Sequence, residues 1–208
     1  MPMSRLRIFW PWTLVILLIL TGCAATNILV NQWNNPAYAS PSFKRIMVSA
    51  AGAQTSIRRN FEDQFVAQLK AAGLDAVASY PYIPEGEKVD ESNVRQAAQK
   101  AGADAAFITR LVGTQERTQV MPGYYPAPFF GFYGGYGYGF YGGPYVYSYD
   151  VYTSETTLYD VAKNDMVWTA TLKSIEPDNI DEAIKRYVDT VINALSEKHL
   201  LGNDHGRN

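Results

Sequence analysis

The 208-residue chain is poor in the side chains that carry most metal, thiol and general acid–base chemistry. It contains one cysteine, Cys23, and two histidines, His199 and His205, both near its end. No histidine pair has the spacing of a metal site, and no glycine-rich phosphate-binding loop is followed by a lysine. No Ser-His-Asp arrangement is marked out either. We therefore expect a protein that is not an enzyme and holds no metal or dissociable cofactor.

The chain also lacks an excess of positive charge. Its 18 basic residues face 20 acidic ones, a net charge of −2, so no basic surface is expected to attract nucleic acid. The acidic cluster Glu85–Glu87 with Asp90–Glu91 has no ordered calcium-ligand pattern and predicts a solvated loop. The pair Glu62-Asp63 lies off the apolar stripe of its predicted helix, which predicts a solvated helix face.

No long apolar run is present at the amino end. Residues 8–20 are apolar but shorter than the about 20 residues of a membrane helix, and Pro11 interrupts them. Arg5 and Arg7 precede this run, which is the plan of a secretory signal. The alternative is an uncleaved membrane helix with a chance cysteine.

The sequence Leu20-Thr21-Gly22-Cys23, which ends the signal, resembles the lipobox of bacterial lipoproteins. The resemblance implies cleavage between Gly22 and Cys23 and acylation of Cys23 with palmitate-type chains as the covalent lipid. Buried acyl chains contribute about 0.8 kcal/mol per methylene, so two or more anchor a protein stably. Ala24 stands where the family has aspartate for inner-membrane retention, which implies sorting to the outer membrane.

Cleavage would leave one domain and a tether. Because Arg5 and Arg7 leave with the signal, the mature net charge becomes −4. The predicted organisation is a signal peptide at 1–22, a lipidated N-terminus and tether at 23–43, a single α/β periplasmic domain at 44–202 with an insertion at 121–149, and a flexible tail at 203–208.

Five apolar or alternating segments are typical of β-strands: 45–50, 75–79, 104–120, 151–161 and 165–174. Lys163-Asn164-Asp165 supplies turn chemistry between the last two, which predicts a hairpin. In its second arm, alternation predicts that Met166, Trp168, Ala170 and Leu172 face inward. Asn27–Trp33 predicts a further short strand at a sheet edge, before Asn34–Pro36 breaks it.

Three segments are typical of helices: 56–72, 90–101 and 179–200. The first has an apolar stripe, with Thr55 or Ser56 as its cap and Gly73 at its end. The second has a small inner face, and the third has Asp178 as its expected cap. The three stripes are Ile57, Phe61, Phe65 and Leu69; Val94, Ala97, Ala98 and Ala101; and Ile180, Ile184, Tyr187, Val191 and Leu195. The main-domain order β-α-β-α-β-β-β-α predicts an α/β fold with a mixed sheet covered by about three helices.

Several segments in this order resemble a widespread group of bacterial envelope lipoproteins. The element order is similar to the periplasmic domains of the curli-secretion lipoprotein and of the outer-membrane activator of penicillin-binding proteins. The resemblance implies a role in protein contacts rather than catalysis. It is carried by Lys44-Arg45-Ile46-Met47-Val48, Arg59-Asn60-Phe61-Glu62-Asp63, Ala101-Gly102-Ala103-Asp104-Ala105, Leu158-Tyr159-Asp160-Val161 and Met166-Val167-Trp168.

Charge is absent from Met121 to Tyr149, a segment rich in glycine, tyrosine and proline. Glycine and proline oppose regular packing, so we expect a disordered, sticky loop between two strands. It is a tolerated insertion, a contact surface that stacks on sugars or docks on a partner, or a membrane-contacting segment. Alternating glycine and aromatic residues also fit self-association. The candidate contact residues are Tyr124, Tyr125, Phe129, Phe130, Tyr133, Tyr136, Tyr138 and Tyr141.

These observations predict a lipid-anchored, non-enzymatic protein of the outer membrane whose domain faces the periplasm. It would act through an envelope protein partner or self-association. The alternative is a lipoprotein that binds peptidoglycan or another carbohydrate through the aromatic loop. A hydrolase with an unrecognised carboxylate site is a third option, which two buried carboxylates facing each other in a cleft would support.

Overall fold

The computed structural model describes residues 27–39, 41, 43–121, 145–175 and 179–201. Over these ranges the chain forms one six-stranded mixed sheet and three helices. The strands are β1 (Asn27–Asn34), β2 (Arg45–Ala51), β3 (Asp75–Ala78), β4 (Ala105–Met121), β5 (Tyr145–Asp160) and β6 (Asp165–Ile175), and the helices are α2 (Thr55–Ala71), α3 (Glu91–Ala101) and α4 (Ile180–Glu197).

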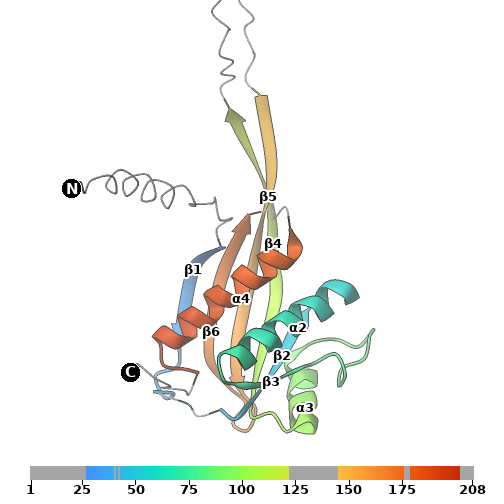
Figure 1. The fold of residues 1–208 in the computed structure, drawn as a ribbon, viewed down its shortest axis with the longest axis vertical. Helices are drawn as coiled ribbons and strands as arrows, with labels where there is room; N and C mark the ends of the chain where they lie inside the picture. Colours follow the sequence, from blue (N-terminus) through green and yellow to red (C-terminus); the bar gives the residue numbers. More distant parts are fainter. Residues whose placement is uncertain (1–26, 40, 42, 122–144, 176–178, 202–208) are drawn as a thin grey trace, which may run out of the picture.

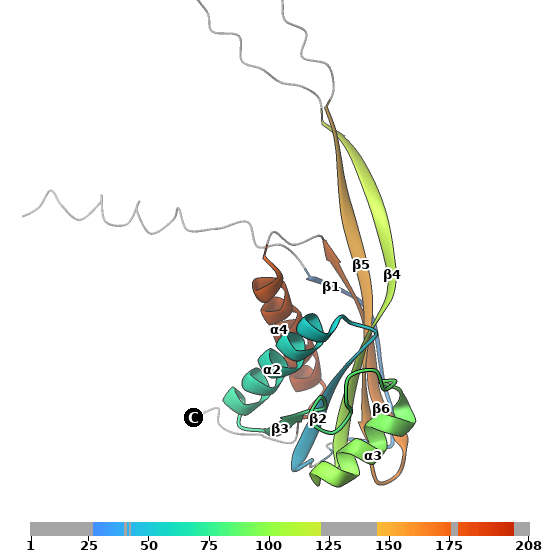
Figure 2. The ribbon, with the colours of Figure 1, turned by 90° about the vertical axis from the view of Figure 1, so that its right-hand side faces the viewer.

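The sheet has the strand order β1-β6-β5-β4-β2-β3. Strand β2 runs parallel to β3 and β4, whereas the other neighbours are antiparallel. Helices α2 and α4 cover one face, and α3 covers the β2–β4 part of the other (Figures 1 and 2). The predicted α/β class, the mixed sheet and the helical cover are confirmed.

Helix α2 buries most of its predicted stripe. Phe61, Phe65 and Leu69 are buried, and the Phe65 ring stacks on Phe107 of β4 with centroids 5.0 Å apart. Ile57, at the first turn, is exposed. The expected cap is also wrong: the N-cap is Gln54, whose side chain makes no capping hydrogen bond.

The small face of α3 is buried as predicted. Val94, Ala97, Ala98 and Ala101 all pack against the sheet, and small side chains let the helix approach it closely. Asp90 caps the helix by accepting from the Asn93 N–H.

Helix α4 begins at Ile180, which is exposed rather than buried, while the rest of its stripe is in the core. Asn179 caps it by accepting from the N–H groups of Asp181 and Glu182; the predicted cap, Asp178, lies outside the described residues. Within the described ranges, no helix is long and apolar enough to span a membrane.

In β6 one inward position differs from the predicted alternation. The register with β5 shifts between Leu158 and Tyr159, which pair with Trp168 and Met166. The skipped residue, Val167, is therefore buried next to Trp168, and Met166 turns outward with 37% of its surface exposed. A bulge of this kind inverts the facing of every residue beyond it.

The segment expected to serve as a tether contributes to the folded body. Strand β1 pairs with β6 at the sheet edge, as its sequence predicted. Tyr38, which follows β1, is 7% exposed and belongs to the core between the sheet, α2 and α4. Its hydroxyl donates to Asp160, 3.1 Å away. The folded part of the chain thus includes residues before Lys44.

Candidate functional site

The residues that the sequence predicted to carry function lie outside the described residues. These are the cleavage and lipidation positions Gly22 and Cys23, and the eight aromatic residues between Tyr124 and Tyr141. What the structure does describe are the two ends of the aromatic loop: Met121 and Tyr145 are paired neighbours in β4 and β5. Residues 145–149, predicted as loop, belong instead to strand β5.

Strands β4 and β5 continue beyond the rest of the sheet. β2 pairs with β4 only as far as Arg110, and β6 pairs with β5 only from Val151. Residues 116–121 and 145–150 pair only with each other and therefore form a two-stranded ribbon that projects from the body (Figures 1 and 2). We call these residues the β4–β5 ribbon. Among the described strands, none pairs with its outer edges.

In the ribbon, the side chains of residues 116–120 and 146–148 are exposed to solvent. Val120 and Val146 lie opposite each other and are 60% and 61% exposed. Leu111 and Val112 are exposed on β4 where the β4–β5 register shifts, between the end of the β2 pairing and the ribbon. Tyr147 stacks on Tyr149 with ring centroids 5.8 Å apart. Exposed apolar side chains beside unpaired strand edges are typical of an interaction surface.

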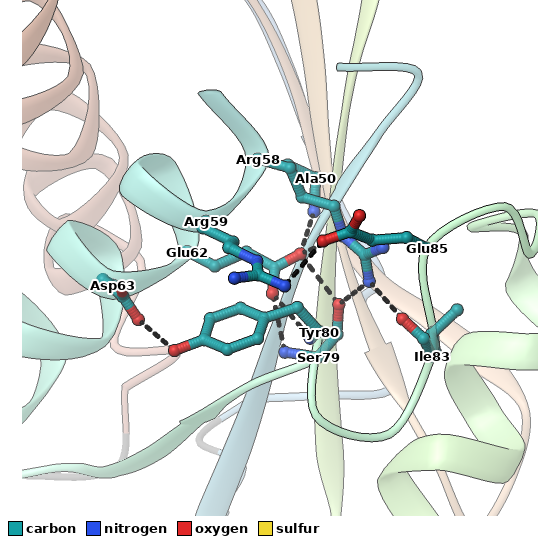
Figure 3. A network of polar contacts seen from close by, with 9 residues as sticks. All are labelled: Ala50, Arg58, Arg59, Glu62, Asp63, Ser79, Tyr80, Ile83 and Glu85. Atoms are coloured by element: carbon teal, nitrogen blue, oxygen red, sulfur yellow. Dashed lines mark hydrogen bonds and ion pairs between the residues drawn. The ribbon is translucent and has the colours of Figure 1, made fainter. Parts of the chain in front are cut away.

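The second group of polar residues is a buried network around Glu62, for which the sequence prediction is wrong. This residue was placed on a solvated helix face, yet it is fully buried. Its carboxylate accepts hydrogen bonds from the backbone N–H groups of Ala50 (3.0 Å), Ser79 (2.8 Å) and Tyr80 (3.0 Å) and from Ser79 Oγ (2.8 Å) (Figure 3). It thereby ties α2 to the carboxyl ends of β2 and β3.

Arg58 completes this network. Its Nε donates to Glu62 at 3.0 Å, and its Nη2 donates to Ser79 Oγ at 2.9 Å and to the Ile83 carbonyl at 3.3 Å. Its side chain is 8% exposed. In the sequence, Arg58 and Glu62 have the i, i+4 spacing of a solvated helix pair. Only the close approach of the β2 and β3 ends buries them.

The network does not have the free capacity that acid–base chemistry needs. A carboxylate offers about four lone-pair sites, and five donors surround the Glu62 oxygens. The other buried carboxylate of the described residues, Asp160, lies beside Ala105 at the opposite end of the parallel strands. The two carboxylates do not face each other, so the pair that would have supported a hydrolase is absent from the described part.

The predicted acidic loop shows no cation site in the described ranges. Glu85 pairs with Arg59 at 2.6 Å, and Asp90 caps α3. Among the residues that the structure describes, no group of three His, Cys, Asp or Glu side chains is placed to hold a metal ion.

Tyr80 joins the edge of the network. Its hydroxyl donates to Asp63 at 3.0 Å, and this carboxylate raises the pKa of Tyr80. The guanidinium of Arg59 lies 5.4 Å from the Tyr80 ring centroid. Figure 3 shows the Tyr80 side chain reaching from the segment after β3 toward Asp63 on α2.

No protein-family model matches the chain, and no curated protein matches it. Among solved structures, the chain is similar to the PelC dodecamer from Paraburkholderia phytofirmans, with 15% identity over 84% of this chain and 99% of that one and a TM-score of 0.47. It is also similar to lipoprotein GNA1162 from Neisseria meningitidis, with 12% identity over 76% of this chain and 99% of that one and a TM-score of 0.41. At such identities and scores we draw nothing about function from either.

Proposed function

We propose that the chain is a lipid-anchored, non-enzymatic protein of the bacterial outer membrane that acts through protein contacts or oligomerisation. The observation that carries the proposal is the β4–β5 ribbon, which projects from the body with exposed apolar side chains. An isolated two-stranded ribbon is marginally stable in water, and an edge strand is a template for another strand. The ribbon is therefore the surface through which a partner or a second copy is bound.

The anchor is supported by the signal plan and the lipobox resemblance of Leu20–Cys23. Mass spectrometry of the mature protein is expected to find an acylated Cys23 at its N-terminus. Cys23→Ser is expected to release the protein from membranes while leaving its thermal unfolding unchanged. An intact Met1 or an unmodified Cys23 would refute the anchor.

The ribbon is tested by photocrosslinking in cells. A photoreactive amino acid at Tyr147, on the ribbon, is expected to capture a protein or a second copy of the chain. The same group at Gln99, exposed on α3, is the matched control and is expected to capture much less.

A ribbon variant separates specific contact from proximity. In Val146→Lys the charge opposes strand-edge association, and the exposed position tolerates it. The adducts from Tyr147 should then decrease, whereas Ile180→Lys, an equally exposed apolar position on α4, should leave them unchanged. Equal yields in both variants, or capture of bulk lipid alone, would count against the ribbon.

Carbohydrate binding is the second candidate function. The aromatic character of the loop continues into the described part of the ribbon, where the Tyr147 and Tyr149 rings stack on each other, and tyrosine supplies flat area with a polar tip. Co-sedimentation with purified cell-wall sacculi tests it. Retention of the full chain that is lost in a Tyr147→Ala, Tyr149→Ala variant would favour this function over protein contacts.

A further inference from the structure

The carboxyl ends of β2 and β3 form a point where the chain divides between the two faces of the sheet. These strands are parallel neighbours, yet the connection after β2 leads to α2 on one face and the connection after β3 leads to α3 on the other (Figure 2). In open α/β sheets, ligands bind in the crevice that such a divergence leaves.

A cleft of about 500 Å³ lies at this point. One wall is the turn from Ala50 to Thr55, in which Gly52 has a φ of 74°. The other wall is formed by Tyr80 and the loop from Glu85 to Val89. A cleft of this volume accepts a small molecule.

Arg58 also lines this cleft. It is more than nine-tenths buried, and its Nε and Nη2 atoms are fixed by Glu62, Ser79 and the Ile83 carbonyl. A guanidinium held in one orientation loses little entropy when it binds, and its planar donors match carboxylate and phosphate oxygens. The buried network thus fixes the orientation of the Arg58 guanidinium at the cleft, while Glu62 balances its charge.

The first turn of α2 adds donors on the same side. Gln54 is in an extended conformation, its side chain does not cap the helix, and no acidic residue lies in the first turn. Thr55, the first residue of the helix, lines the cleft. The leading N–H groups of a helix have no partner within it, and the helix dipole favours negative charge at this end. Arg59, which pairs with Glu85 at 2.6 Å, also lines the cleft, together with Glu87 and Lys88.

We propose that this cleft binds a small molecule through a carboxylate or phosphate group held between Arg58 and the first turn of α2. The site is independent of the ribbon and of the membrane anchor. Carboxylate and phosphate share the chemistry that these donors recognise, so separate titrations with sodium acetate and with inorganic phosphate distinguish the two.

Thr55→Pro tests the contribution of the first turn of α2 most directly. Thr55 is the first residue of α2, a position where proline fits the helix and removes only an N–H. Gln54, with φ −60° and ψ 148°, already has the conformation required before proline. The matched control is Glu91→Pro at the first position of α3, outside the cleft. Circular dichroism melts verify that both variants are folded.

A charge variant provides a second arm, which does not depend on the proline. Arg59→Gln removes a cation from the cleft rim. Lys70→Gln removes the same charge from the last turn of the same helix. If Thr55→Pro does not fold, this pair decides the proposal.

Binding is measured by isothermal titration calorimetry on the full chain in a non-ionic detergent, at constant ionic strength. We expect saturable binding of acetate or phosphate, weakened about tenfold by Thr55→Pro through the loss of one charge-assisted hydrogen bond, and weakened also by Arg59→Gln. Glu91→Pro and Lys70→Gln should bind as the unmodified chain does. Absence of saturable binding by both anions, or equal weakening in variants and controls, would overturn the proposal.

Discussion

At the scale of single residues, the fold depends on a buried ion pair that joins three elements. Glu62 and Arg58 lie on α2 and bind the ends of β2 and β3 through backbone and side-chain hydrogen bonds. Removing charges from water is costly, so a buried pair is weak evidence for net stability. Removing one residue of the pair is nevertheless strongly destabilising, because the charge of the other would remain buried without a partner.

Glu62→Gln should therefore destabilise the protein strongly. The amide keeps the shape of the side chain but turns an NH2 group toward existing donors and leaves Arg58 without its counter-charge. We expect a loss of about 3–5 kcal/mol in the free energy of unfolding, measured by urea denaturation. Asp63→Asn, one residue further on the exposed face, should cost less than about 1 kcal/mol. Similar losses in both variants would contradict the structural role of Glu62.

Tyr38 provides a pH-dependent contribution to stability. Burial, reinforced by the hydrogen bond to Asp160, raises the pKa of Tyr38 to about 12, whereas tyrosine in an unfolded chain has a pKa of about 10. The folded state thus holds the phenolic proton more tightly. The contribution of Tyr38 to stability is therefore complete below about pH 10 and is lost as the pH rises through about 12.

Urea midpoints measured at several pH values from 8 to 11 test this effect. The unmodified chain should lose stability in the alkaline range more steeply than Tyr38→Phe, which has no proton to release there. Burial also raises the pKa of Tyr187, so the difference between the two proteins is the quantity to compare. Parallel curves would show that Tyr38 does not contribute.

At the scale of elements, the helices and the ribbon differ in what stabilises them. The helices α2, α3 and α4 each bury a stripe against the sheet, so their stability comes from tertiary packing. The ribbon has no layer of described elements over its exposed valines. Its strands are held by their mutual pairing, which leaves apolar side chains and strand edges available for contact.

The aromatic loop is expected to contribute little to folding. Deleting Tyr124–Pro144 leaves residues 122–123 to join Met121 and Tyr145, which are already paired. Closing a loop depends only weakly on its length, so thermal unfolding should change by less than about 2 kcal/mol. Differential scanning calorimetry measures this change. Collapse of the fold on deletion would show that the aromatic rings form part of the core.

At the scale of the whole molecule, the amino-terminal segment completes the sheet. β1 covers the edge of β6, and Tyr38 together with Leu29 packs against the core formed by the sheet, α2 and α4. A protein anchored through Cys23 would thus be held by a segment that is itself part of the folded body, rather than by a free linker.

Deleting residues 27–43 should therefore destabilise the body by at least about 3 kcal/mol, because a large core side chain is lost and β6 becomes an exposed edge prone to association. Chemical denaturation and light scattering measure both effects. Trp33→Ala, in the same segment but at an exposed side chain, should change stability by less than about 1 kcal/mol. A deletion variant as stable as the full chain would show that the segment is only a tether.

Much of the fold could be predicted from local patterns. The small face of α3 and the edge strand from Asn27 are both present, because each depends on side-chain periodicity within one segment. The predicted inward facing of Met166 was wrong because a bulge shifts its register. The predicted exposure of Glu62 was wrong because two strand ends approach α2. Neither event leaves a trace in the spacing of nearby residues.

The sequence by itself determined the α/β class, the helix and strand segments and the expectation of a lipid anchor, because hydrophobic periodicity and the signal plan are local. Only the tertiary structure decided that Arg58 and Glu62 are buried, that β4 and β5 extend as a ribbon, and that Tyr38 enters the core. These outcomes depend on which strands become neighbours and where their pairing ends, and such contacts join residues far apart in the chain.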